Sequence, residues 1–164
     1  MKPTFLLFTF SIFISVSTAF AQSVISPDSS ITARVFTDNP ATLLGLTPLE
    51  LVERFGAPPR VFAVRGAEAW QDDVVFDYGE GVSLFLFMDR VWQVRVAKPY
   101  RNPVLGVALG STTGLAASVL GVPVQSLAGA IEWVVLGQAW PVRLRCLIDE
   151  AGNIQELYVY RADF

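Results

Sequence analysis

The stretch LGLTPLELVERFGAP, residues Leu44–Pro58, contains the start, the body and the end of a short helix. Thr47 can cap the helix with its hydroxyl, Pro48 suits the first helical position, and Glu50 completes a T-x-x-E capping box. Gly56 is suited to the left-handed backbone conformation that ends a helix, and the proline two residues later prevents the helix from resuming. This stretch therefore predicts one short, well-delimited helix.

The same pattern of helix-start and helix-end residues recurs downstream in LGSTTGLAASVLGVP, residues Leu109–Pro123. The two stretches align without a gap and share five residues: Leu44/Leu109, Gly45/Gly110, Thr47/Thr112, Gly56/Gly121 and Pro58/Pro123. The helix positions that are apolar in the first stretch stay apolar in the second: Leu51, Val52 and Phe55 align with Ala116, Ala117 and Leu120. We interpret the match as a duplicated unit. Its second helix should be the weaker one, because Gly114 costs about 1 kcal/mol relative to alanine.

After each helix the hydrophobic pattern changes to a period of two, which is typical of strands. The predicted strands of the first half are Arg60–Arg65, Val74–Tyr78, Val82–Phe87 and Val91–Val96. Those of the second half are Ala130–Leu136, Val142–Ile148 and Ile154–Arg161. Short turns such as GEG and MDR separate neighbouring strands, which favours antiparallel pairing.

The expected fold is α+β, with two tandem units that each consist of a short helix followed by a three- to four-stranded antiparallel sheet. Residues 44–98 form the first unit and residues 109–164 the second, with a polar, proline-containing linker over residues 99–108. Residues 22–43 form an N-terminal extension. A single sheet shared by the two units is also open.

The N-terminus has the pattern of a secretory signal peptide over residues 1–21. Lys2 precedes the apolar run Phe5–Val16, and Ala19-Phe20-Ala21 fits the small-x-small cleavage pattern. No cysteine stands directly after the run, at the cleavage site, so the sequence offers no acceptor for a bacterial lipid anchor. We expect a periplasmic or secreted protein.

The composition excludes several functions. Without Lys2 the chain has 11 basic and 15 acidic residues, a balance that does not favour binding to nucleic acid. Cys146 is the only cysteine, so no intramolecular disulfide can form. The sequence contains no histidine, which excludes Ser-His-Asp and Cys-His catalysis and removes the commonest zinc ligand.

Some segments resemble ligand or membrane sites, but each has a simpler interpretation. One acidic segment lacks the residue order of a calcium loop, and we interpret it as the solvated end of a hairpin: Asp72, Asp73, Asp77 and Glu80. The glycine-rich GVALGSTTG lacks the lysine of a phosphate loop. We therefore expect no metal, no cofactor and no catalytic residues. The uncharged run Asn102–Ile131 leaves membrane association through residues 102–123 as an alternative.

The repeat resembles the unit shared by β-lactamase inhibitor proteins and the SmpA/OmlA lipoproteins of outer-membrane barrel assembly. The helix motif is carried by Gly45, Thr47, Leu51, Phe55, Gly56 and Pro58, and the later strand pair by Val82, Leu84, Leu86, Asp89, Val91 and Val94. The resemblance implies the fold, an exported location and binding to another protein. Unlike the inhibitors, this chain cannot form disulfides, and unlike the lipoproteins it has two units and no lipidation cysteine.

Alternation along two late strands predicts a polar sheet face. If the apolar residues of these strands face the helices, the open face carries Arg143, Arg145, Glu156, Tyr158 and Tyr160. Arginine and tyrosine anchor many protein interfaces, because they bury a large area and keep a polar group. An ordinary solvated sheet face with cross-strand pairs explains the pattern equally well.

The strand VSLFLF is apolar on both faces, since Leu84 and Leu86 point one way while Phe85 and Phe87 point the other. Such a strand needs cover on both sides, which favours contact between the two units or with another protein, and Trp92 should pack nearby.

We therefore expect an exported, non-catalytic protein-binding module, such as an inhibitor or an envelope-assembly scaffold. Its partner would be another protein of the cell envelope, and a homodimer is also open. The alternatives are a hydrolase that uses only carboxylates, and a protein held at a membrane.

Overall fold

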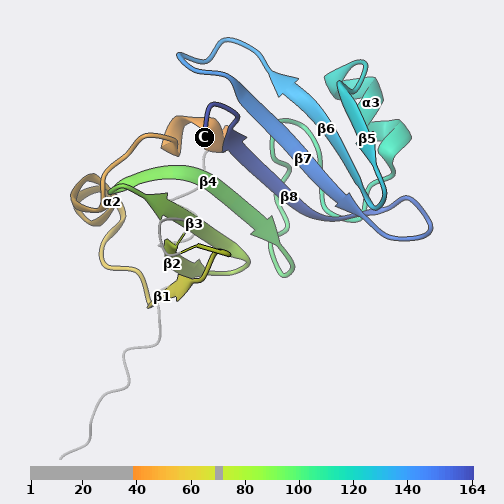
Figure 1. Cartoon of the computed structure of the whole chain (residues 1–164). Coiled ribbons are helices and arrows are strands. Elements are labelled where there is room, and N and C mark those ends of the chain that lie inside the picture. The colour runs from red at the N-terminus through yellow and green to blue at the C-terminus, as the bar shows by residue number, and fades with distance from the viewer. Residues whose placement is uncertain (1–38, 69–71) are drawn as a thin grey trace, which may run out of the picture.

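The computed structural model describes residues 39–68 and 72–164, so the predicted signal peptide and most of the N-terminal extension lie outside the described residues. The first half contains the 3-10 helix η1 (Pro40–Leu43), α2 (Pro48–Phe55), β1 (Arg60–Val64), β2 (Asp73–Gly79), β3 (Val82–Phe87) and β4 (Arg90–Ala97). The second half contains α3 (Thr113–Leu120), β5 (Gln125–Leu127), β6 (Ala130–Val135), β7 (Val142–Ile148) and β8 (Ile154–Arg161) (Figure 1).

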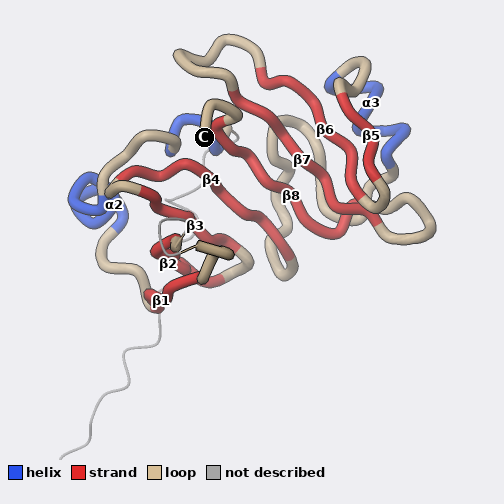
Figure 2. The backbone as a smooth tube through the Cα atoms, viewed as in Figure 1, coloured by secondary structure: helices blue, strands red, loops and turns tan. Residues whose placement is uncertain are grey.

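The eight strands of the described residues belong to one antiparallel sheet, in the order β1-β2-β3-β4-β8-β7-β6-β5. The α+β class and the antiparallel pairing are confirmed, but the strands do not form two separate sheets. The first four strands occupy one side of the sheet and the last four the other, and β4 and β8 join them in the middle (Figures 1 and 2). The order is thus symmetric about the β4–β8 pair.

Two elements were not predicted from the sequence: the 3-10 helix η1, whose residues Ala41 and Leu43 enter the core, and strand β5. The strand is only three residues long, and Gln125, Ser126 and Leu127 are all exposed. Its register, with Gln125 opposite Glu132 and Leu127 opposite Ala130, comes from the tight turn into β6. Three residues are too few to show the alternation by which a strand is recognised in a sequence.

Helix α2 begins with the predicted capping box. The Thr47 hydroxyl accepts a hydrogen bond from the Glu50 amide at 3.2 Å, and the Glu50 carboxylate accepts one from the Thr47 amide at 2.8 Å. Gly56 ends the helix with a φ of 82°. In α3 the Thr112 hydroxyl accepts from the Leu115 amide at 3.3 Å, but the first turn contains no acidic residue that could return the bond.

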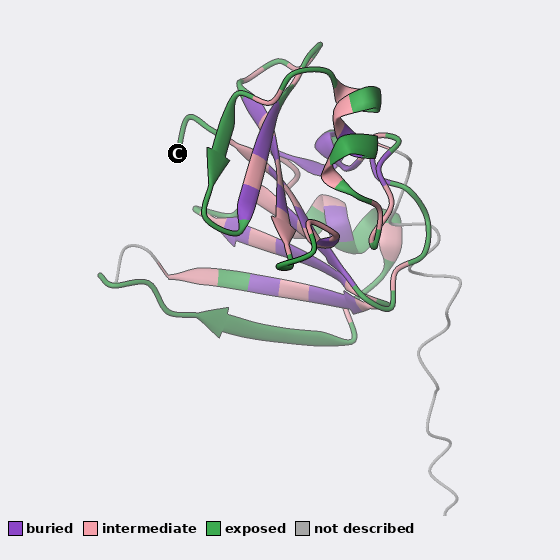
Figure 3. Cartoon of the chain, turned by 90° about the vertical axis from the view of Figure 1, so that its right-hand side faces the viewer, coloured by how far each residue is buried: buried purple, intermediate pink, exposed green. Residues whose placement is uncertain are grey.

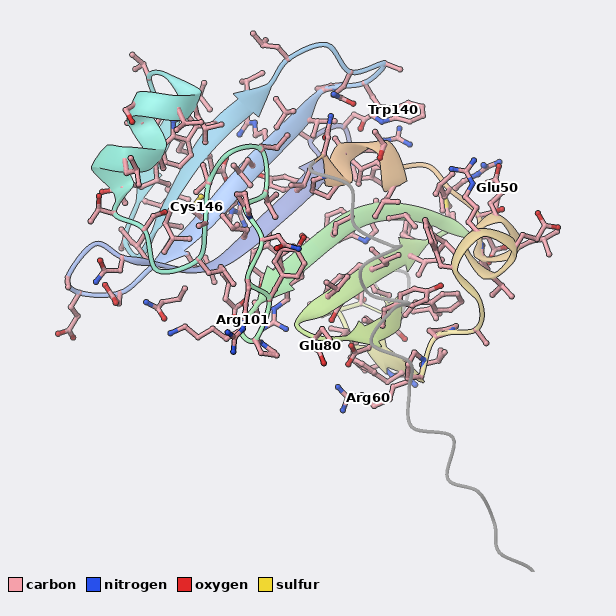
Figure 4. The ribbon with its side chains drawn as sticks, turned by 180° about the vertical axis from the view of Figure 1, so that it is seen from behind. Glu50, Arg60, Glu80, Arg101, Trp140 and Cys146 are labelled. Carbon is pink, nitrogen blue, oxygen red and sulfur yellow. The ribbon has the colours of Figure 1, made fainter. Side chains whose placement is uncertain are left out.

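One hydrophobic core fills the space between the sheet and the helices, and we call this side of the sheet the covered face. Leu51 of α2 and Ala116 of α3 are buried against it. Val104 and Val107, from the segment between the halves, are also buried in this core and bond to each other's backbone. Figure 4 shows this segment crossing the covered face, and Figure 3 shows buried residues along the inner strands.

We expect α3 to open more readily than α2, because its capping box is incomplete and Gly114 lies in its first turn. Leu115→Glu should complete the box with Thr112 and stabilise α3 by about 0.5–1 kcal/mol. Native-state hydrogen exchange of the α2 and α3 amides measures the free energy of opening of each helix, in the unchanged protein and in the variant. Leu115→Lys is the matched control, because it places the opposite charge at the same exposed position. Equal protection of the two helices in the unchanged protein would contradict the expectation.

Candidate functional site

The face of the sheet opposite the helices carries the five polar residues that strand alternation predicts there. We call it the open face. Arg143 and Arg145 of β7 lie opposite Tyr160 and Tyr158 of β8. Glu156 precedes Tyr158 by two residues in β8 and therefore lies on the same face. All five side chains are half-buried, whereas their neighbours Leu144, Cys146, Leu157 and Val159 are fully buried on the covered face. The open face therefore places these residues side by side across two strands.

A carboxylate that the sequence analysis did not single out holds the first group together. Glu132 of β6 is fully buried, and its Oε1 accepts hydrogen bonds from Arg145 Nε at 2.6 Å and from the Tyr160 hydroxyl at 2.9 Å. Its Oε2 accepts from Arg143 Nη1 at 3.0 Å. Burial by itself raises the pKa of Glu132, but the hydrogen bonds from Arg145, Tyr160 and Arg143 outweigh it and lower the pKa.

A second group crosses the junction between the halves. Arg95 of β4 donates through Nε and Nη2 to the two Glu156 oxygens, at 2.8 and 2.6 Å, in the forked geometry of a strong ion pair. The Tyr158 hydroxyl donates to Glu156 at 2.6 Å and accepts from Arg95 at 3.1 Å. The hydrogen bond from Arg95 lowers the pKa of Glu156, so the carboxylate stays ionised at neutral pH.

The sequence around Glu132 and Arg95 contains a pattern that indicates a buried ion pair. Each is the single charged residue of an otherwise apolar or neutral strand stretch, AIEWVV and VWQVRVA. A charge at such a place needs a partner on a neighbouring strand. Which strand supplies the partner depends on the register: Glu132 lies opposite Arg145, and Arg95 opposite Tyr158.

The apolar part of the open face lies in the first half. Phe85 and Phe87 of β3 are half-buried, and Leu84 and Leu86 are buried on the covered face, as the alternation predicts. The Phe87 and Trp92 rings contact the Phe164 ring, with centroid distances of 5.9 and 6.3 Å. Residues near the C-terminus thus provide part of the cover that this strand needs.

Trp92 also has a polar contact. Its ring nitrogen donates a hydrogen bond to the Asp73 carboxylate at 2.9 Å. Burial raises the pKa of Asp73, and the hydrogen bond from Trp92 opposes that effect. Trp92 is therefore fixed on both its apolar and its polar side.

In the part of the chain that the structure describes, no three acidic or cysteine side chains gather into a group that could hold a metal ion. Asp77 forms an ion pair with Arg60, and Asp72 with Arg65. Cys146 is buried beneath the segment that crosses the covered face (Figure 4), and burial raises the pKa of its thiol to about 12. A thiol with such a pKa is protonated at neutral pH and is a poor nucleophile.

Within residues 39–68 and 72–164, no helix is long and apolar enough to cross a membrane. The uncharged run Asn102–Ile131 contributes a buried connection, the eight-residue helix α3 and the short strand β5.

No protein-family model matches the chain, and no curated protein matches it. Among solved structures, the chain is similar to an extracellular protein containing a SCP domain from Bacillus anthracis str. Ames, with a TM-score of 0.47 and 11% sequence identity. The similarity covers 74% of this chain and 45% of that chain, so this chain spans less than half the length of the protein it matches. The function has to be inferred from the residues of the open face.

We expect Glu132→Gln to reduce the free energy of unfolding at pH 7 by about 1–3 kcal/mol, because it replaces charge-assisted hydrogen bonds in a buried place. The pKa of Glu132 is lowered in the folded state, so its contribution is present above the unfolded value of about 4.3 and is lost as the pH falls below it. In urea unfolding between pH 7 and pH 2.5, the free energy of unfolding should therefore fall less with decreasing pH in this variant than in the unchanged protein.

The control is Glu150→Gln, which changes an exposed carboxylate in the turn between β7 and β8. It should unfold at the same urea concentration as the unchanged protein at pH 7, because the Glu150 side chain is exposed. If Glu132→Gln unfolds at the same urea concentration as this control, Glu132 does not stabilise the open face.

Proposed function

We propose that this chain is an exported, non-catalytic protein-binding module that binds its partner with the open face of the sheet. The observation that carries the proposal is the pair of hydrogen-bonded groups around Glu132 and Glu156, which fix arginine and tyrosine side chains on a sheet face that the helices leave uncovered.

The fixed side chains remain accessible to a partner. The Arg143 and Arg145 side chains are 39% and 42% exposed although both are bonded to Glu132. Binding costs free energy when flexible side chains become ordered, and arginines held in place before binding reduce this cost. Tyr158 and Tyr160 lie beside them and add area that a partner can bury.

The aromatic residues extend the same surface into the first half. Phe85 and Gln93 lie opposite each other on β3 and β4, and Gln93 lies opposite Tyr160 of β8. The proposed binding surface therefore combines an apolar region around Phe85, Phe87 and Trp92 with a polar region around Arg143, Arg145, Glu156, Tyr158 and Tyr160. A mixed surface of this kind is typical of protein interfaces.

We also propose that the halves are tandem copies of one unit, residues 44–98 and 109–164, related to the β-lactamase inhibitor and SmpA/OmlA unit. The matching threonine caps at Thr47 and Thr112 and the symmetric strand order support this kinship. In this proposal the leader directs the chain to the periplasm or the exterior, where it acts as an inhibitor or an assembly scaffold.

The observed pairing of carboxylates gives the hydrolase alternative little support. A glycosidase needs two carboxyl groups that face each other across a substrate. Glu132, Glu156 and Asp77 are each bonded to arginine in separate places on the open face.

Arg143→Ala and Tyr158→Ala test the proposed surface. Each should weaken binding of the partner, isolated from an envelope extract, by about tenfold or more, since arginine and tyrosine anchors commonly contribute more than 1 kcal/mol. Arg101→Ala is the matched control, because Arg101 lies on the segment that crosses the covered face (Figure 4). Titration calorimetry with the purified partner measures the three affinities. Equal loss in all three variants, or loss only with Arg101→Ala, would place the binding surface elsewhere.

A further inference from the structure

The end of the sheet formed by β1 carries an exposed apolar strand. All five residues of β1 are exposed, including Val61 at 56%, Phe62 at 45% and Val64 at 40%. In Figure 3 this strand is the fully exposed arrow at the lower edge of the sheet. Val74 of the neighbouring strand β2 is also exposed and lies opposite Ala63, on the same face as Val61, whereas Phe62 and Val64 lie on the other face.

Within residues 39–68 and 72–164, the outer edge of the β1 backbone has no strand partner. Among the described residues, β2 is the only strand that pairs with β1, and it uses one of its two edges. The other edge presents amide and carbonyl groups to whatever lies next to it. Proteins commonly protect such an edge with a very short strand or with unpaired charges. At the opposite end of the sheet, β5 follows this rule, because it has only three residues.

The charges next to β1 are neutralised within the same chain. Arg60 at the start of the strand is paired with Asp77, and Arg65 just after its end is paired with Asp72. Between them the strand contains only Val61, Phe62, Ala63 and Val64. A strand added at this edge therefore runs along four uncharged residues, with an exposed but paired arginine at each end, and a partner strand of the same composition leaves no buried charge unpaired.

We propose that β1 pairs antiparallel with β1 of a second copy of this chain, with Phe62 opposite Phe62 of that copy. In this register Arg60 lies opposite Val64 and Val61 opposite Ala63, so no two arginines face each other. The two phenylalanines form a cross-strand aromatic pair at the twofold axis. Pairing of a strand with its own copy gives a closed dimer, whereas pairing of β1 with β5 of another copy would continue into a filament.

The dimer joins two eight-stranded sheets edge to edge and brings their open faces into one continuous surface. Antiparallel pairing keeps Phe62 on the same face as Val75 and Phe85, with which it is in register. Two binding surfaces in one particle would bind a multivalent partner more tightly than either surface alone. The dimer itself does not rest on the proposed function, and its test needs no partner protein.

The first test is the mass of the purified protein in solution by sedimentation equilibrium between about 1 and 100 μM. We expect a concentration-dependent dimer for the unchanged chain. Phe62→Lys should weaken the dimer at least 30-fold, because it places two ammonium groups opposite each other at the axis. Leu49→Lys, an identical change of charge at a 66% exposed position on α2, should leave the dimer intact. Circular dichroism melting of the variants shows that they remain folded.

The second test fixes the register. Cys146 is buried, so a cysteine introduced on β1 is the reactive thiol. Phe62→Cys should form an intermolecular disulfide under mild oxidation, whereas Ala63→Cys, whose counterpart at the edge is Val61, should form it much more slowly. A monomer at 100 μM, a dimer that survives Phe62→Lys, or equal cross-linking at both positions would each overturn the proposal.

Discussion

Five residue pairs between β4 and β8, from Gln93 opposite Tyr160 to Ala97 opposite Glu156, hold the two halves of the chain in one sheet. Val94 and Val96 of β4 and Leu157 and Val159 of β8 are fully buried on the covered face of this junction. The core is therefore continuous from one half to the other. On the opposite face the junction places Arg95 next to Glu156, and their ion pair links the halves a second time.

The polar organisation of the open face follows from this junction and from strand alternation. Because successive side chains point to opposite faces, burial of the apolar residues on the covered face places the residues between them on the open face. Glu132 is one of these residues, and it needs hydrogen-bond partners there. A fully buried carboxylate would be strongly unfavourable by itself, and the two arginines and the tyrosine around it make it tolerable. The same contacts that satisfy Glu132 also orient the side chains that we assign to partner binding.

Local signals in the sequence were sufficient for the helices α2 and α3 and for most of the strands, but not for η1. The capping residues of α2 predicted its start, and Gly56 its end, because these preferences depend only on neighbouring residues. Alternation likewise predicted which residues of β7 and β8 share a face. Strand β5 was missed because three residues are too few to show alternation, and the contacts of Arg95 and Glu132 were missed because only the strand register identifies their partners.

The sequence by itself determined the α+β class, the helix caps and the polarity of each strand, since all of these are properties of residues close together along the chain. Tertiary structure alone decided that eight strands form one sheet and that residues between the halves enter the core. It also decided that Glu132 and Glu156 accept hydrogen bonds from the arginines of the open face. The position of β1 at one edge of the sheet is likewise a tertiary feature. These features depend on strand order and register, which are fixed by contacts between residues far apart in the chain.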